Sequence, residues 1–154
     1  MKRGFKKGFT LIELLIVLAV IAALLAVVTP IALNAVKRAN LTKIASNLRN
    51  IKSAAETYVT MNYEDLSDDI DDLLEEDNPI LIGDYLTTNP NEDPDNPDYS
   101  AKLEYDDTTG DITVTIEYTG PDVSSEDINK LHEIYSEVDP DKDSPQVKFE
   151  IKSW

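Results

Sequence analysis

The chain has 154 residues, a formal net charge of −16 and no cysteine, so a fold held together by disulfides is excluded. It has one histidine, His132, and no glycine-rich phosphate-binding loop, and no second titratable residue stands at a recognisable catalytic spacing from that histidine. The sequence therefore predicts a non-catalytic protein.

The charge is divided into blocks along the chain. Residues 1–8 carry +4, residues 9–61 carry +3 and residues 62–154 carry −23. A strongly acidic surface repels phosphate backbones and attracts cations or a basic partner. We therefore expect no direct nucleic acid binding by residues 62–154, which are long enough for one small domain.

An apolar run follows the basic residues at the start of the chain. It covers the twenty residues Phe9–Val28, among which only Thr10 and Glu13 are polar. At 1.5 Å per residue such a helix crosses a hydrocarbon core of about 30 Å. No Ala-x-Ala cleavage site occurs in residues 14–40, so we expect the run to be retained as a span. The excess of basic residues before it predicts an N-terminus in the cytoplasm and the remaining chain outside.

Glu13 is unusual because a carboxylate inside an apolar span is costly and normally has a partner or a function. It belongs to a string in which a short basic leader ends at Gly8 and is followed by FTLIEL, residues 9–14. This string resembles the processing site of bacterial type IV pilins and type II secretion pseudopilins. The resemblance implies that a prepilin peptidase cuts between Gly8 and Phe9 and methylates the new amine of Phe9. It also implies that Glu13 pairs with the Phe9 ammonium of a neighbouring subunit during assembly.

The helical pattern continues beyond the span. An apolar stripe at alternating spacings of three and four residues comprises Leu41, Ile44, Leu48, Ile51, Ala55 and Tyr58. We expect one helix over residues 9–61, with residues 9–30 serving membrane and filament and residues 31–61 packing on a sheet. Pro30 predicts a kink or an opened stretch, since it removes one helical hydrogen bond. A proline at this distance from Gly8 also resembles the pilin pattern, which implies local melting in assembled filaments.

Residues 62–154 read as an acidic globular head. For residues 62–98 we expect a loop with a short helix carrying Leu66, Ile70, Leu73 and Leu74, with Ser67 as its cap. Alternating residues predict strands at 99–105 and 112–118, joined as a hairpin, and a closing strand at 146–153. Within residues 124–138, Ser124 or Ser125 should cap a helix from Glu126 to Val138. Its apolar face comprises Ile128, Leu131, Tyr135 and Val138. The fold class is therefore α+β and pilin-like: a long N-terminal helix whose second half packs on a three- or four-stranded antiparallel sheet.

One possible metal site lies before the closing strand. Asp139, Asp141 and Asp143 have the acid spacing of a calcium loop, but Ser144 stands where the glycine of the sharp turn is needed. Certain pseudopilins bind calcium in a loop of the sheet region, so the resemblance keeps a Ca²⁺ site open at these three aspartates. The other interpretation is a solvated acidic turn without any cofactor.

Together these features predict a structural pilin subunit that forms a homo-oligomeric helical filament. Its expected partners are the prepilin peptidase, the membrane and the pilus assembly platform. The precursor should reside in the cytoplasmic or inner membrane and the filament at the cell surface. Two alternatives stay open at this point: a pseudopilin of a type II secretion system, and a monomeric membrane-anchored acidic binding module that depends on calcium.

Overall fold

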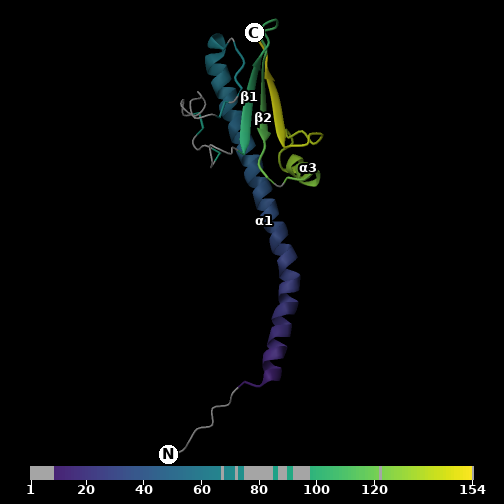
Figure 1. Ribbon diagram of the computed structural model, residues 1–154. Helices are drawn as coiled ribbons and strands as arrows, with labels where there is room; N and C mark the ends of the chain where they lie inside the picture. Colours follow the sequence, from purple (N-terminus) through teal and green to yellow (C-terminus); the bar gives the residue numbers. More distant parts are fainter. Residues whose placement is uncertain are drawn as a thin grey trace, which may run out of the picture. The chain divides into compact units, whose positions relative to one another are not determined.

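The computed structural model describes residues 9–66, 68–71, 73–74, 85–86, 90–91, 98–121 and 123–153. Its elements are helix α1 (Leu11–Asn62), the 3-10 helix η1 (Tyr63–Asp65), strands β1 (Tyr99–Tyr105) and β2 (Ile112–Tyr118), helix α3 (Ser125–Ile134) and strand β3 (Gln146–Ile151) (Figure 1). The chain divides into two compact units, residues 1–39 and residues 40–154.

Within the first unit, residues 11–39 are entirely helical and every described side chain is exposed. The helix continues through Pro30, which cannot donate a backbone hydrogen bond. Just before it, the hydroxyl of Thr29 donates to the carbonyl oxygen of Leu25 at 2.7 Å. The described chain is thus not opened at Pro30, and a bend of the helix axis there stays a prediction.

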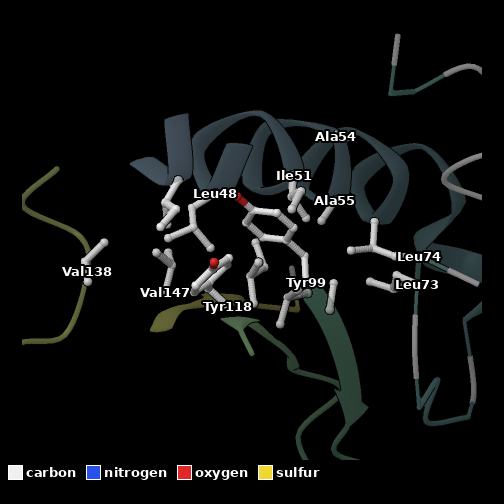
Figure 2. Packing of buried hydrophobic residues seen from close by; sticks show 14 of the residues in the cluster. Leu48, Ile51, Ala54, Ala55, Leu73, Leu74, Tyr99, Tyr118, Val138 and Val147 are labelled. Atoms are coloured by element: carbon white, nitrogen blue, oxygen red, sulfur yellow. The ribbon is translucent and has the colours of Figure 1, made fainter. Parts of the chain in front are cut away.

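Within the second unit, α1 lies against one face of the sheet. All six residues of the expected stripe are buried, which confirms the packing face inferred from their spacing: Leu41, Ile44, Leu48, Ile51, Ala55 and Tyr58. Figure 2 shows Leu48, Ile51 and Ala55 on the side of the helix that faces the strands, with Tyr99, Tyr118 and Val147 opposite them. The core of the second unit is therefore a layer between one helix and one sheet.

The sheet has three antiparallel strands in the order β1-β2-β3. The observed bounds of β1 and β2 confirm the predicted hairpin. In its turn, the Asp106 carboxylate accepts hydrogen bonds from the amides of Thr108 and Thr109, and Gly110 takes a φ of 76° that favours glycine.

The closing strand β3 is shorter than predicted, since it ends at Ile151 and not at residue 153. The ladder ends there because Ile151 pairs with Ile112, which is the first residue of β2. The Ser153 amide donates to Asp111 Oδ1 at 3.0 Å and its hydroxyl donates to the carbonyl oxygen of Thr109 at 2.8 Å. These bonds hold Ser153 against the turn of the hairpin.

Helix α3 begins as expected but ends four residues early, at Ile134 and not at residue 138. Ser124 is its N-cap, and the Ser124 and Asp127 side chains form a capping box. Tyr135 has an extended backbone, and Val138 forms an antiparallel bridge with Val147 of β3. The apolar spacing of Tyr135 and Val138 thus reflects burial in the core after the helix has ended.

The segment after η1 also differs from the expectation. In place of a helix over Leu66–Leu74, its described residues run beside β1. Ile70 and Leu103 exchange two backbone hydrogen bonds of 2.9 Å, and the Leu73 amide donates to the carbonyl oxygen of Ala101 at 2.7 Å. Edge strands present unpaired backbone groups, and this pairing satisfies some of them. Ser67 and most of the loop 75–97 lie outside the described residues.

A cluster of polar and aromatic side chains joins α1 to the segment after α3. Lys52 Nζ lies 2.8 Å from Glu137 Oε2, to which the Tyr135 hydroxyl donates at 2.6 Å. The guanidinium carbon of Arg49 stands 4.7 Å from the centre of the Tyr135 ring. These contacts fix the chain between α3 and β3 against the helix.

Candidate processing and assembly site

The first turn of α1 is built around Thr10 and Glu13. The Glu13 Oε2 atom accepts one hydrogen bond from the Thr10 amide at 2.8 Å and a second from the Thr10 hydroxyl at 2.7 Å. In return, the Glu13 amide donates to Thr10 Oγ1 at 3.3 Å. This reciprocal arrangement is a capping box, in which Thr10 is the N-cap and Glu13 the third residue of the helix.

The capping box gives Glu13 a partner within its own chain, which the sequence interpretation missed. The sequence contains the signature of a capping box, since Thr10 and Glu13 form a Thr-x-x-Glu pattern before an apolar run. A carboxylate in the first turn also interacts favourably with the positive end of the helix dipole. The side chain is therefore stabilised where it stands before any second molecule is considered.

Phe9 lies immediately outside this capped turn, and it is 88% exposed. Its expected neighbour across the cleaved bond, Gly8, lies outside the described residues, as does the basic leader. Helix α1 begins two residues after Phe9. Phe9 and Thr10, on the retained side of the expected cleavage point, thus lie outside the helix.

The helix that follows exposes a long apolar surface. We call it the exposed apolar run, residues 9–36; its large apolar side chains are Phe9, Leu11, Ile12, Leu14, Leu15, Ile16, Val17, Leu18, Val20, Ile21, Leu24, Leu25, Val27, Val28, Ile31, Leu33 and Val36. Among the described residues, one helix is long and apolar enough to cross a membrane, and this run supplies its apolar part. A single chain in water would leave this surface uncovered, so it requires lipid or protein around it.

The described residues of the segment before β3 do not form a cluster of metal ligands at the predicted calcium site. The Asp141 amide donates to Asp139 Oδ1 at 3.0 Å, and Asp143 is exposed in the same connection. The part of the chain that the structure describes contains no group of three or more acidic or histidine side chains that could hold a metal ion. The Ca²⁺ site at Asp139, Asp141 and Asp143 stays a prediction.

His132 has a structural contact. Its Nδ1 atom lies 2.7 Å from the carbonyl oxygen of Val138, so that nitrogen donates when it carries the proton. The bond ties the end of α3 to the segment that pairs with β3. The imidazole ring therefore has a structural role in the head, because it links two segments of its fold.

Comparison with known proteins gives one family match. Residues 3–29 match the model of the prokaryotic N-terminal methylation motif. The searches of curated proteins and of solved structures returned no significant match. The matched residues include Gly8, Phe9 and Glu13, and the fold that follows them is an α+β pilin-like architecture. The chain thus carries the class III prepilin signal that characterises type IV pilins and pseudopilins.

Proposed function

We propose that this protein is a structural pilin subunit. It is cleaved after Gly8, N-methylated at Phe9 and polymerised through α1 into a type IV pilus. The observation that carries the proposal is the exposed apolar run, which starts at Phe9 and contains one acidic residue, Glu13. A helix that is apolar on all sides must be surrounded by other apolar groups.

Two environments can surround the exposed apolar run in turn. In the precursor, twenty residues from Phe9 to Val28 match the thickness of a bilayer. In a filament, the same run of neighbouring copies packs together and forms the core. The acidic head, which contains the second unit's sheet, then remains in water, where its charge keeps it soluble.

Cleavage supplies a cationic partner for Glu13 in addition to the hydrogen bonds from Thr10. It creates an α-ammonium on Phe9, and an ammonium and a carboxylate in a low-dielectric layer attract each other strongly. Either charge alone would be costly there, so a pair between copies favours the register in which the two meet. The prepilin peptidase and the assembly platform are the partners that this route requires.

The test is electron microscopy of material sheared from the cell surface, with mass spectrometry of the main filament protein. We expect filaments made of this chain with a methylated Phe9 as the first residue. A matched pair of variants extends the test: Glu13→Ala and Glu56→Ala remove the two acidic residues of the region 9–61. Glu13→Ala should abolish assembly while cleavage continues, and Glu56→Ala should assemble. Normal filaments from Glu13→Ala would refute the proposal.

A pseudopilin of a secretion system is the second candidate, because the same N-terminal motif occurs in both classes. Electron microscopy and mass spectrometry of the sheared material distinguish a pilin from a pseudopilin. A processed chain that stays in the membrane fraction and forms no surface filament would favour the pseudopilin. A chain that keeps Met1 would refute both and favour a membrane-anchored binding module.

A further inference from the structure

The sheet has one face that does not pack on α1. Its side chains belong to the residues that alternate with the buried ones, and the strand register arranges them in rows across the three strands. From β1 through β2 to β3, the rows are Ser100, Glu117 and Gln146; Lys102, Thr115 and Lys148; and Glu104, Thr113 and Glu150. We call the last two rows the charged face, and all four of its charged residues are exposed.

The two rows of the charged face have opposite signs. Two lysines occupy the outer positions of one row and two glutamates those of the next, with a threonine between them in each row. The rows are two residues apart along each strand, which is about 6.8 Å. The charged face is thus balanced in charge, although residues 62–154 as a whole carry −23.

The ion pairs that these side chains form within the chain are exposed. Lys102 Nζ lies 3.4 Å from Asp71 Oδ1, and Glu150 Oε2 lies 3.9 Å from Lys152 Nζ. The Lys102 side chain is 55% exposed and that of Glu150 is 51% exposed. Exposed ion pairs are weak, so these side chains can exchange one partner for another at little cost.

The acids at the two ends of the charged face have hydrogen bonds within their own chain. At one end, the Ser144 hydroxyl donates to Glu117 Oε1. At the other end, the Asp106 carboxylate accepts from two amides of its own turn, and Asp111 Oδ1 accepts from the Ser153 amide. Donors of this kind stabilise the charge of a carboxylate where it stands. The lysine and glutamate rows are therefore the part of this face that can recognise a partner.

A second copy of the charged face is complementary to the first. A two-fold axis that runs parallel to the rows, midway between them, places the lysine row of one copy over the glutamate row of the other. Lys102 then faces Glu104 of the second copy, and Lys148 faces Glu150. Packed sheets lie about 10 Å apart, a gap that the long lysine and glutamate side chains can bridge from both sides. A shift by one row would bring like charges together, so the pattern favours a single register.

We propose that the charged face binds the charged face of a second copy of this chain and that this contact joins filaments into bundles. The inference rests on the proposed function, since it needs a filament that displays the heads. Copies within one helical filament are related by a screw operation, whereas this contact is two-fold, so it joins copies from two filaments. Each contact is weak, but a filament repeats it many times, and such repetition can raise the overall affinity roughly 10²- to 10⁴-fold.

The test reverses the charge of one row at a time in the full chain. Lys102→Glu with Lys148→Glu makes the charged face acidic, and Glu104→Lys with Glu150→Lys makes it basic. Low-speed sedimentation and electron microscopy of sheared filaments measure the bundled fraction, at about 0.15 M salt, where charges are screened beyond about 8 Å. Either double variant alone should lower the bundled fraction of wild type by about tenfold or more, because the loss is repeated at every head. Mixing the two kinds of filament should restore bundles that contain both.

The control for net charge is Lys130→Glu with Lys142→Glu, which changes the charge of the head equally but outside the charged face. It should form bundles as wild type does. A milder variant, Lys102→Gln with Lys148→Gln, removes the lysine charges without reversing them and should also lower the bundled fraction.

The outcomes separate this inference from the proposed function. Wild-type filaments that stay single, a mixture that does not bundle, or a control that loses its bundles would each overturn the inference. A bundled fraction equal to that of wild type in any variant of the charged face would do the same. In all of these cases the filaments are present, so the proposed function stands. Failure of the wild-type chain to form filaments would refute the proposed function itself.

Discussion

Helix α1 contains two apolar regions that behave in opposite ways. The exposed apolar run, residues 9–36, buries none of its described side chains, whereas the stripe from Leu41 to Tyr58 is buried against the sheet. Both regions are helical and rich in Leu, Ile and Ala. The difference lies in the pattern, because the run is apolar on every side and the stripe occupies one side only.

This difference shows which partner each region can use. One face of a three-stranded sheet can cover a single stripe, and the polar residues beside that stripe remain in water. A helix that is apolar all round needs a surrounding medium, which a small domain cannot provide. Apolar content alone would have assigned both regions to one core.

The largest expected effect comes from shortening a residue of the buried stripe. Leu48 is fully buried, so Leu48→Ala should lower the free energy of unfolding of the head by about 2–5 kcal/mol through lost contacts and a cavity. The measurement is denaturant unfolding of the processed chain in detergent micelles, with the near-ultraviolet circular dichroism of the tyrosines as the signal. Leu24→Ala, the same change in the exposed apolar run, should leave this transition in place; a comparable shift from Leu24→Ala would contradict the comparison.

The next effect comes from a charge placed in the exposed apolar run. Leu18 lies near the middle of the expected span, Phe9–Val28, and an arginine at the centre of a span disfavours insertion by about 2.5–3.5 kcal/mol on insertion scales. Leu18→Arg should therefore reduce the carbonate-resistant membrane fraction of the precursor. Ser53→Arg places the same charge on an exposed position in the second half of α1 and should not reduce it. Equal membrane fractions for both variants would contradict the assignment of the span.

The sequence predicted those parts of the fold in which local pattern and tertiary packing agree. The stripe of α1 and the hairpin have periodicities that match their burial, and the turn 106–111 carries its own hydrogen-bonding residues. The N-cap of α3 was likewise narrowed to two serines, and the structure selects Ser124. In these segments the local preferences suffice.

Predictions failed where a distant segment supplied the backbone partners. Ile70 and Val138 have helical spacing from their neighbours, yet each forms a bridge with a strand residue, Leu103 and Val147 respectively. Helical spacing shows that side chains share a buried side; it does not show that the backbone is helical. At the candidate site, Glu13 was recognised because a carboxylate inside an apolar span is energetically costly. Its hydrogen bond from Thr10 follows from a different feature, the capping box at the start of the helix.

A smaller effect concerns the tyrosine that faces the stripe from β1. The Tyr99 hydroxyl accepts a hydrogen bond from Asn47 Nδ2 at 3.0 Å, and burial raises the pKa of Tyr99 to about 12. Since its folded pKa exceeds the unfolded value of about 10, its contribution to stability is complete below pH 10 and is lost as the pH rises to about 12. Tyr99→Phe should cost about 1 kcal/mol at pH 7 and weaken this alkaline loss.

The corresponding measurement is the free energy of unfolding between pH 7 and pH 12 for wild type, Tyr99→Phe, Asn47→Ala and the double variant. Asn47→Ala should cost less in the Tyr99→Phe background, because the shared hydrogen bond is already absent. An alkaline loss of the same size in wild type and Tyr99→Phe would contradict the role assigned to Tyr99.

The smallest effect comes from the charged edge of the stripe, where Lys52 meets Glu137. The hydrogen bonds from Lys52 and Tyr135 lower the pKa of Glu137, so its contribution to stability is present above the unfolded pKa of about 4.3 and is lost as the pH falls through the lower folded value. The Glu137 side chain is 46% exposed, which weakens the pair through solvent and salt. Glu137→Gln should thus cost under about 1 kcal/mol at pH 7 and almost nothing at an acidic pH below both the folded and the unfolded pKa of Glu137, where both states are protonated. Glu104→Gln on the exposed face of β1 is the control for net charge, and a cost for Glu137→Gln that stays the same at both pH values would indicate packing in place of charge.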